Sequence, residues 1–312
     1  MSDEHLPLLE KIVDQDIQEI FNTDESYSNL LTTYTQDDIL VPNIRAHVPF
    51  FASIRDYKGA YMHDDQKYLW IIKPVNDEEI HQARLGMYVY FLNHFTGSIS
   101  APSIVTEIDG QLYKASKIIP RTEQLSGAPY QENRHLSSQL ALDLINSWIY
   151  YDEDRNPNNY LIYYNTHNIP VVVAIDFSNV DLLTKDIKIK GREDTFGWER
   201  LEKTRYMTPL KNEQFFEYSY EFYSTRLNAY KKLNKTTLNK IGNAIFAKDE
   251  NCKTITAQLT TNILQRIEYV DNYFQSWFND PEKLRTLQKR TKKEMKDEYR
   301  LMGRFFNEQL NQ

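Results

Sequence analysis

Residues 152–159 read Asp-Glu-Asp-Arg-Asn-Pro-Asn-Asn, and residues 175–177 read Ile-Asp-Phe. The first stretch follows an apolar stripe at helical spacing, and two β-rich runs joined by a short polar loop separate it from the second. Two such runs predict a hairpin, whose ends lie side by side. We therefore expect Asp154, Asn159 and Asp176 to meet at one site.

These residue types in this order favour phosphoryl transfer. That reaction needs a carboxylate to orient the attacking hydroxyl, an amide oxygen and a second carboxylate for Mg²⁺, and a cation on the phosphates. Asp154 and Asn159 lie five residues apart in one loop, and Asp176 returns on the hairpin. Lys73 ends the β-rich segment 67–73 and is the candidate cation. The alternative for Lys73 is an ordinary edge-strand lysine.

The pattern Asp-Arg-x-x-x-Asn, a hairpin and Ile-Asp-Phe resembles the catalytic and metal-binding motifs of the HipA-like kinases and the related phosphatidylinositol kinases. The resemblance to the HipA-like family extends over residues 50–280 or so. It implies that Asp154 is the catalytic aspartate, that Asn159 and Asp176 are the Mg²⁺ ligands, and that Lys73 contacts the ATP phosphates. The implied activity is Mg²⁺–ATP-dependent phosphorylation of Ser or Thr on a protein.

The resemblance also implies where ATP lies. The residues expected near its adenine edge follow a predicted hairpin strand and are Ser116, Lys117, Ile118 and Ile119. Arg155 matches the arginine of the family's loop and is expected to hold that loop through a carboxylate. Asp152 is interpreted as a loop or capping residue.

Several positions depart from the kinase patterns. The loop before the strand lysine has a single glycine, Gly59. Ser178 replaces the glycine usual after the metal aspartate and its aromatic, and Asn156 stands where phosphatidylinositol kinases usually carry histidine. Glu78 and Glu79 are the candidates for the helix glutamate that pairs with the strand lysine.

The order of elements predicts an α+β chain with a two-lobed, protein-kinase-like fold, a β-rich N-lobe and a mainly helical C-lobe. Asp109-Gly110 between two β-rich runs is a strong hairpin signal. Helices are predicted over residues 78–95 and 136–149. The expected domains are a helical extension (1–45), the N-lobe (46–119), the C-lobe with the catalytic and metal-binding loops (120–280) and a basic C-terminal helix (281–312).

Composition restricts the class of protein. A net charge of −7 over 312 residues argues against a chain-wide nucleic-acid footprint. The lone Cys252 excludes an intramolecular disulfide framework and a Cys-rich zinc site. Apolar runs fall short of the roughly 18 residues that span a bilayer. The acidic N-terminus has no signal-peptide pattern, which predicts a cytoplasmic protein, with a secreted effector lacking a cleavable signal as the alternative.

Three expectations concern partners and alternatives. We expect a protein substrate, and the resemblance implies a small regulatory or antitoxin-like partner. The basic residues of 282–304 predict either an anionic-ligand site or a solvated amphipathic helix. The alternative functions are a phosphoinositide or small-molecule kinase of the same fold, and a nucleotide-binding pseudokinase that acts as an interaction module.

Overall fold

The computed structural model describes residues 61–63, 69–119, 122–130, 132–152, 154–164, 168–183, 217–282 and 284–285. The predicted extension over 1–45, the loop around Gly59 and nearly all of the predicted helix over 281–312 lie outside the described residues.

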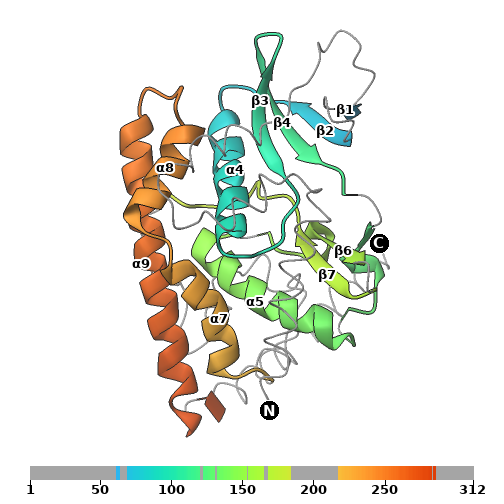
Figure 1. Ribbon diagram of the computed structural model, residues 1–312, viewed down its shortest axis with the longest axis vertical. Helices are drawn as coiled ribbons and strands as arrows, with labels where there is room; N and C mark the ends of the chain where they lie inside the picture. Colours follow the sequence, from blue (N-terminus) through green and yellow to red (C-terminus); the bar gives the residue numbers. More distant parts are fainter. Residues whose placement is uncertain are drawn as a thin grey trace, which may run out of the picture.

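A four-stranded antiparallel sheet occupies the upper part of Figure 1. Its order is β1-β2-β4-β3, made of β1 (Tyr61–His63), β2 (Leu69–Pro74), β4 (Gln111–Lys117) and β3 (Ser103–Ile108). β3 and β4 form the predicted hairpin. Its turn residues Asp109 and Gly110 have positive φ angles of 50° and 82°, as a two-residue type I′ turn requires. β2 ends at Pro74, one residue beyond the predicted strand.

Helix α4 (Ile80–Phe95) packs between this sheet and helix α8 (Figure 1). Asn76 begins it by accepting a hydrogen bond from the Glu79 N–H (2.9 Å), and Gly97 follows its end with a φ of 69°. Every residue from Leu85 to Asn93 is buried, because α4 is covered on all sides. The prediction of a helix over 78–95 is confirmed.

A second antiparallel sheet has the order β5-β6-β7 and packs on helix α5. Its elements are β5 (Thr122–Gln124), the 3₁₀ turn η3 (Leu125–Gly127), α5 (Arg134–Tyr150), the 3₁₀ turn η4 (Pro157–Asn159), β6 (Tyr160–Tyr164) and β7 (Pro170–Ala174). The β6–β7 hairpin and the α5 helix were both predicted, whereas β5 was not. Gln139 joins α5 to β7 by accepting from the Val172 N–H (2.8 Å) and donating to the Pro170 carbonyl (2.9 Å).

Three helices complete the described part of the chain: α7 (Tyr220–Lys231), α8 (Lys235–Ile245) and α9 (Cys252–Phe278). Ser219 and Asn234 cap α7 and α8 through their side-chain oxygens. α9 runs along the left side of Figure 1. An apolar stripe along it is buried at Leu259, Ile263, Ile267, Val270 and Phe274.

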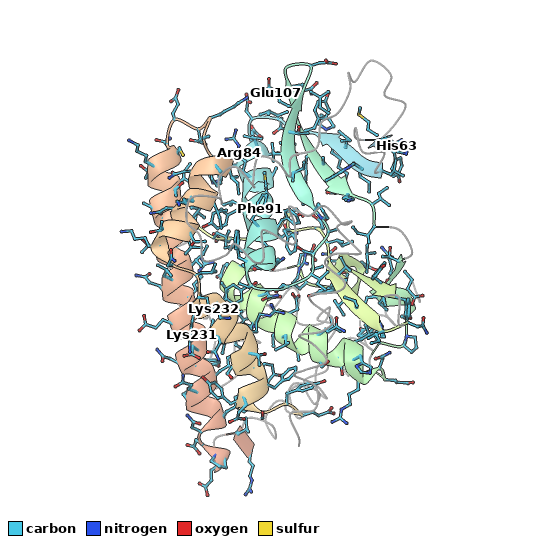
Figure 2. The ribbon with its side chains drawn as sticks, viewed as in Figure 1. His63, Arg84, Phe91, Glu107, Lys231 and Lys232 are labelled. Carbon is cyan, nitrogen blue, oxygen red and sulfur yellow. The ribbon has the colours of Figure 1, made fainter. Side chains whose placement is uncertain are left out.

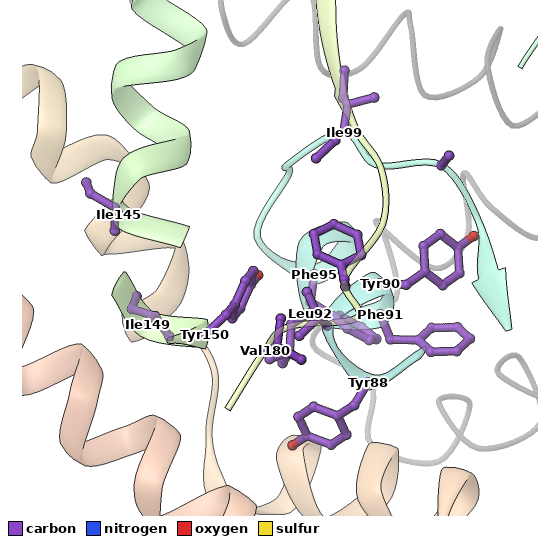
Figure 3. Close-up of a cluster of buried hydrophobic side chains, with 14 of the residues drawn as sticks. Tyr88, Tyr90, Phe91, Leu92, Phe95, Ile99, Ile145, Ile149, Tyr150 and Val180 are labelled. Carbon is purple, nitrogen blue, oxygen red and sulfur yellow. The ribbon is translucent and has the colours of Figure 1, made fainter. Parts of the chain in front are cut away.

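The core joins α4 to α5 and contains polar groups as well as apolar ones. Figure 3 shows Leu92 and Phe95 of α4 in one buried cluster with Tyr150 of α5. The Tyr150 hydroxyl donates to Asn93 Oδ1 (2.6 Å) and lies 2.6 Å from the Tyr230 hydroxyl of α7. Their pairing spares these two hydroxyls the penalty that an unpaired buried hydroxyl carries.

The mixed α+β class with antiparallel sheets is confirmed, and the two-lobed division stays a prediction. α4 contacts both β3 and α8, so helices and sheets share one continuous core in the described residues. In the described part of the chain, no helix has both the length and the apolar character of a membrane span.

Candidate functional site

The loop after α5 is held by a buried ion pair. Tyr151 ends α5 in the left-handed region, and the next residue, Asp152, is 1% exposed. The Arg155 Nε atom lies 2.8 Å from Asp152 Oδ2, while Asp152 Oδ1 accepts from the Asp154 N–H (3.0 Å). Burial raises the pKa of Asp152, and the Arg155 guanidinium works in the opposite direction. Asp152 is therefore a loop residue, one of the two roles that the sequence predicted, and it is also the buried ion-pair partner of Arg155.

Arg155 also ties this loop to the loop after β7. Its Nη2 donates to the carbonyl oxygens of Ile175 (2.8 Å) and Asp176. The guanidinium carbon lies 4.8 Å from the centre of the Phe177 ring and 5.4 Å from that of Tyr160, within cation–π range. The prediction that Arg155 holds its loop through a carboxylate is confirmed, and its reach to the second loop is a further finding.

Two side-chain amides fix the Asp154 carboxylate. Asn156 donates to Asp154 Oδ1 (2.7 Å), and Asn179 donates to Asp154 Oδ2 (3.1 Å). The Asn159 side-chain nitrogen donates to the Asp154 carbonyl. Because the side-chain nitrogen of Asn159 is used in this hydrogen bond, its amide oxygen is the atom that can bind a cation.

The β6–β7 hairpin brings Asp176 back beside this loop. Tyr160 is opposite Ala174 in the register, and the Ile175 N–H donates to the Asn159 carbonyl (3.0 Å). Asp176 is the next residue and has a φ of 53°. The structure thus brings together the loop of Asn159 and the residue that sequence spacing had placed beside it.

Asp176 faces a lysine that the sequence analysis did not single out. Lys114 Nζ, on β4, lies 3.3 Å from Asp176 Oδ1. Burial works to raise the pKa of the Asp176 carboxyl, but Lys114, a hydrogen bond from Ser178 and the Arg155 charge together outweigh it, so the pKa is lowered. The carboxylate is therefore kept ionised beside an ammonium group.

Lys73 lies directly opposite Lys114 on the neighbouring strand, and its side chain is exposed. In the part of the chain that the structure describes, no ion pair joins Lys73 to Glu78 or Glu79. Glu79 instead takes part in the turn that starts α4, where its N–H bonds to Asn76. The sequence alone could place Lys114 on one face of its strand, because every second residue of a strand lies on the same face. It could not show that this strand pairs with β2 in the register that puts Lys114 opposite Lys73.

The segment expected at the adenine edge leads out of β4. The backbone N–H groups of Lys117 and Ile118 each donate to a carbonyl of a neighbouring segment at 2.9 Å. The Ile119 side chain is buried, and Ser116 is half-buried. An adenine ring here would have to be recognised by other polar groups of the segment.

Helix α4 braces the loop that carries Asp176. A Cβ atom added at Gly86 would lie 3.2 Å from the Phe177 carbonyl oxygen, so the glycine permits close contact between helix and loop. Gln82, one turn earlier, donates to the Val180 carbonyl (2.8 Å). Phe177 itself is buried.

Helix α9 holds the chain that leaves the site. Arg266 donates to the carbonyls of Ile149 (3.0 Å) and Asp181 (2.7 Å), and Asn262 donates to that of Leu182 (2.9 Å). Burial lowers the pKa of Arg266 to about 10, although Asp181 opposes the shift. Both loops of the site are thus anchored by buried arginines.

A small cavity of about 50 Å³ lies elsewhere, lined by residues that include Asp143, Asn146 and Arg226. None of the residues that line it belongs to the loops of Asp154 and Asp176.

Groups of three or more His, Cys, Asp or Glu able to hold a metal are absent from the described part of the chain. A metal at the candidate site would therefore depend on few protein ligands.

No protein-family model and no curated protein matches the chain. Among solved structures, the chain is similar to CtkA, a proinflammatory kinase of Helicobacter pylori, with a TM-score of 0.41, 11% identity, and 69% of this chain and 94% of that chain covered. It is also similar to a toxin–antitoxin complex of HipA, HipB and operator DNA from Shewanella oneidensis MR-1, with a TM-score of 0.39, 8% identity, and 76% and 73% covered. Likenesses this distant carry no argument about the activity of the chain.

Proposed function

We propose that the chain is a Mg²⁺–ATP-dependent kinase of HipA-like type that transfers the γ-phosphoryl group to a Ser or Thr hydroxyl of a protein. The observation that carries the proposal is the connection of the two carboxylate loops. Arg155 bonds to the backbone of the Asp176 loop while its own loop carries Asp154. Phosphoryl transfer depends almost entirely on positioning and electrostatics, and a rigid link of this kind supplies positioning.

The residues around Asp176 fit a magnesium ion. Mg²⁺ prefers oxygen ligands and is commonly bound by one or two carboxylates together with water and substrate phosphates. Asp176 is held ionised, and the Asn159 amide oxygen is left for a ligand. When bound, the metal would neutralise the charge of the β- and γ-phosphates.

The remaining roles follow from position. Asp154, held by two amides, would accept the proton of the attacking hydroxyl. Lys73 would contact the phosphates, and the segment from Ser116 through Lys117 and Ile118 to Ile119 would border the adenine. A protein substrate and an antitoxin-like partner rest on the sequence resemblance alone.

The test is transfer of labelled γ-phosphate from ATP with Mg²⁺, on the full chain alone and with a cell lysate. Asp154→Asn should lower labelling by about 10²–10⁴-fold, the usual contribution of a positioned general base. Asp176→Asn should also abolish most of it. The matched control is Asp77→Asn, because Asp77 is an exposed carboxylate in the turn before α4.

Two results would contradict the proposal. Labelling that persists in Asp154→Asn would remove that residue from the chemistry. A wild-type chain that binds ATP and labels nothing in any lysate would favour the pseudokinase alternative. Labelling of lipid or small-molecule fractions in place of protein would keep the kinase and change its substrate.

A further inference from the structure

Two lysines face each other across the upper sheet. Lys73 on β2 and Lys114 on β4 are directly opposite in the antiparallel register. Like charges in such pairs destabilise a sheet. Lys114 is paired with Asp176, whereas the described residues include no ion-pair partner for Lys73. On this face of the sheet, the positive charge of Lys73 therefore has no ion-pair partner among the described residues.

The strand alternation sets which face the lysines occupy. Ile72 and Ala115, their neighbours along β2 and β4, are 1% and 0% exposed on the opposite face of the sheet. Lys73 is exposed and Lys114 is partly exposed, with a side chain 21% accessible. Both ammonium groups thus belong to the face that looks toward the Asp176 loop. A polyanion is the ligand class that such a pair suits.

We propose that Lys114 is a phosphate-binding residue that neutralises Asp176 in the absence of metal and contacts the nucleotide phosphates when Mg²⁺ occupies that carboxylate. This inference rests on the proposed function and extends it to a residue outside the motif. The ammonium and a divalent cation compete for Asp176 Oδ1, where Lys114 Nζ now lies at 3.3 Å. A lysine released from the carboxylate keeps a flexible stem and three donors for phosphate oxygens.

Loss of this amine should therefore have opposite effects on the two ligands. Metal binding without nucleotide should tighten about two- to five-fold, since a partly exposed ion pair no longer competes with the metal. ATP binding with Mg²⁺ should weaken about tenfold or more, because a charge-assisted hydrogen bond is lost. A residue with a purely structural role would weaken both.

The experiment uses the full chain, with Mn²⁺ as the metal probe and Mg²⁺–ATP as the nucleotide probe. Free Mn²⁺ is followed by its electron paramagnetic resonance signal, and ATP binding by titration calorimetry. The variants are Lys114→Gln, Lys114→Arg and Lys73→Gln. The control is Lys248→Gln, which removes a surface ion pair with Glu107 (2.6 Å) far along the chain from both loops.

Tighter Mn²⁺ binding together with weaker ATP binding in Lys114→Gln supports the inference, as does recovery of ATP affinity in Lys114→Arg. Lys73→Gln should weaken ATP binding and leave Mn²⁺ binding unchanged, because Lys73 does not contact Asp176. If Lys114→Gln behaves as Lys248→Gln does, or weakens both ligands alike, the inference is wrong. A wild-type chain that binds neither probe overturns the proposed function itself.

Discussion

Arg155 is the residue on which the geometry of the candidate site most depends. It is 4% exposed, pairs with the buried Asp152 carboxylate, and donates to the backbone of Ile175 and Asp176. Removal of this side chain would leave the Asp152 charge buried without its partner.

We expect Arg155→Met to lower the free energy of unfolding by about 3–5 kcal/mol, the cost of breaking a buried ion pair by removing one member. Chemical denaturation followed by circular dichroism measures it. Asp152→Asn and the double variant complete a double-mutant cycle. The double variant should be less destabilised than the two single changes added together. Strict additivity would contradict a direct Arg155–Asp152 interaction.

Sequence reasoning identified the residues whose proximity depends on local structure. Asp154 and Asn159 share one loop, and a hairpin returns Asp176, so spacing and β-propensity were sufficient. Lys114 and Asn179 were missed because their place beside these carboxylates depends on strand register and on how the loops fold over each other. Glu79, one of the two candidates for the helix glutamate, lies in the turn that starts α4, where its N–H bonds to the Asn76 side chain.

At the scale of elements, α4 and the Asp176 loop are in unusually close contact. A Cβ atom added at Gly86 would lie 3.2 Å from the Phe177 carbonyl oxygen, closer than most Cβ atoms come to a neighbouring atom. The atom in the way is a backbone oxygen, which cannot move aside by changing a rotamer. The helix was predicted over residues 78–95, whereas this contact was not.

We expect Gly86→Leu to lower the free energy of unfolding by about 1–3 kcal/mol, the usual cost of overpacking a core. It should also displace the loop that carries Asp176 and so weaken Mn²⁺ binding. Denaturation curves and Mn²⁺ titration measure the two effects. Gly127→Leu is the control, since the space around a Cβ atom there is open to 4 Å. Equal stability of the two variants would show that α4 does not press on the loop.

At the scale of the whole molecule, contacts far from the site keep its parts in register. Arg84 of α4 pairs with Asp249 (3.5 Å), and Glu107 of β3 pairs with Lys248 (2.6 Å), both in the connection between α8 and α9. Figure 2 shows Arg84 and Glu107 in the upper part of the molecule, near that connection. These pairs are partly exposed and individually weak. One buried apolar core draws residues from both sheets and from α4, α5, α7, α8 and α9, so it connects these elements directly.

The α+β class and most helix and strand positions were predictable because apolar periodicity and turn residues are written locally in the chain. β5 was missed because three residues carry too little pattern to reveal a strand that exists only through pairing with β6. The two-lobed division depends on how whole elements pack, and it stays a prediction.

The central claim is that the loops of Asp154 and Asp176 form one magnesium–nucleotide site. The most direct test is thermal unfolding of the full chain with ATP, with and without Mg²⁺, for wild type and Asp176→Asn. At ATP concentrations about 100 times Kd, binding should add about 2.7 kcal/mol to the stability of wild type. We expect this stabilisation to require Mg²⁺ and to disappear in Asp176→Asn. Equal melting temperatures with and without Mg²⁺–ATP in the wild type would contradict it.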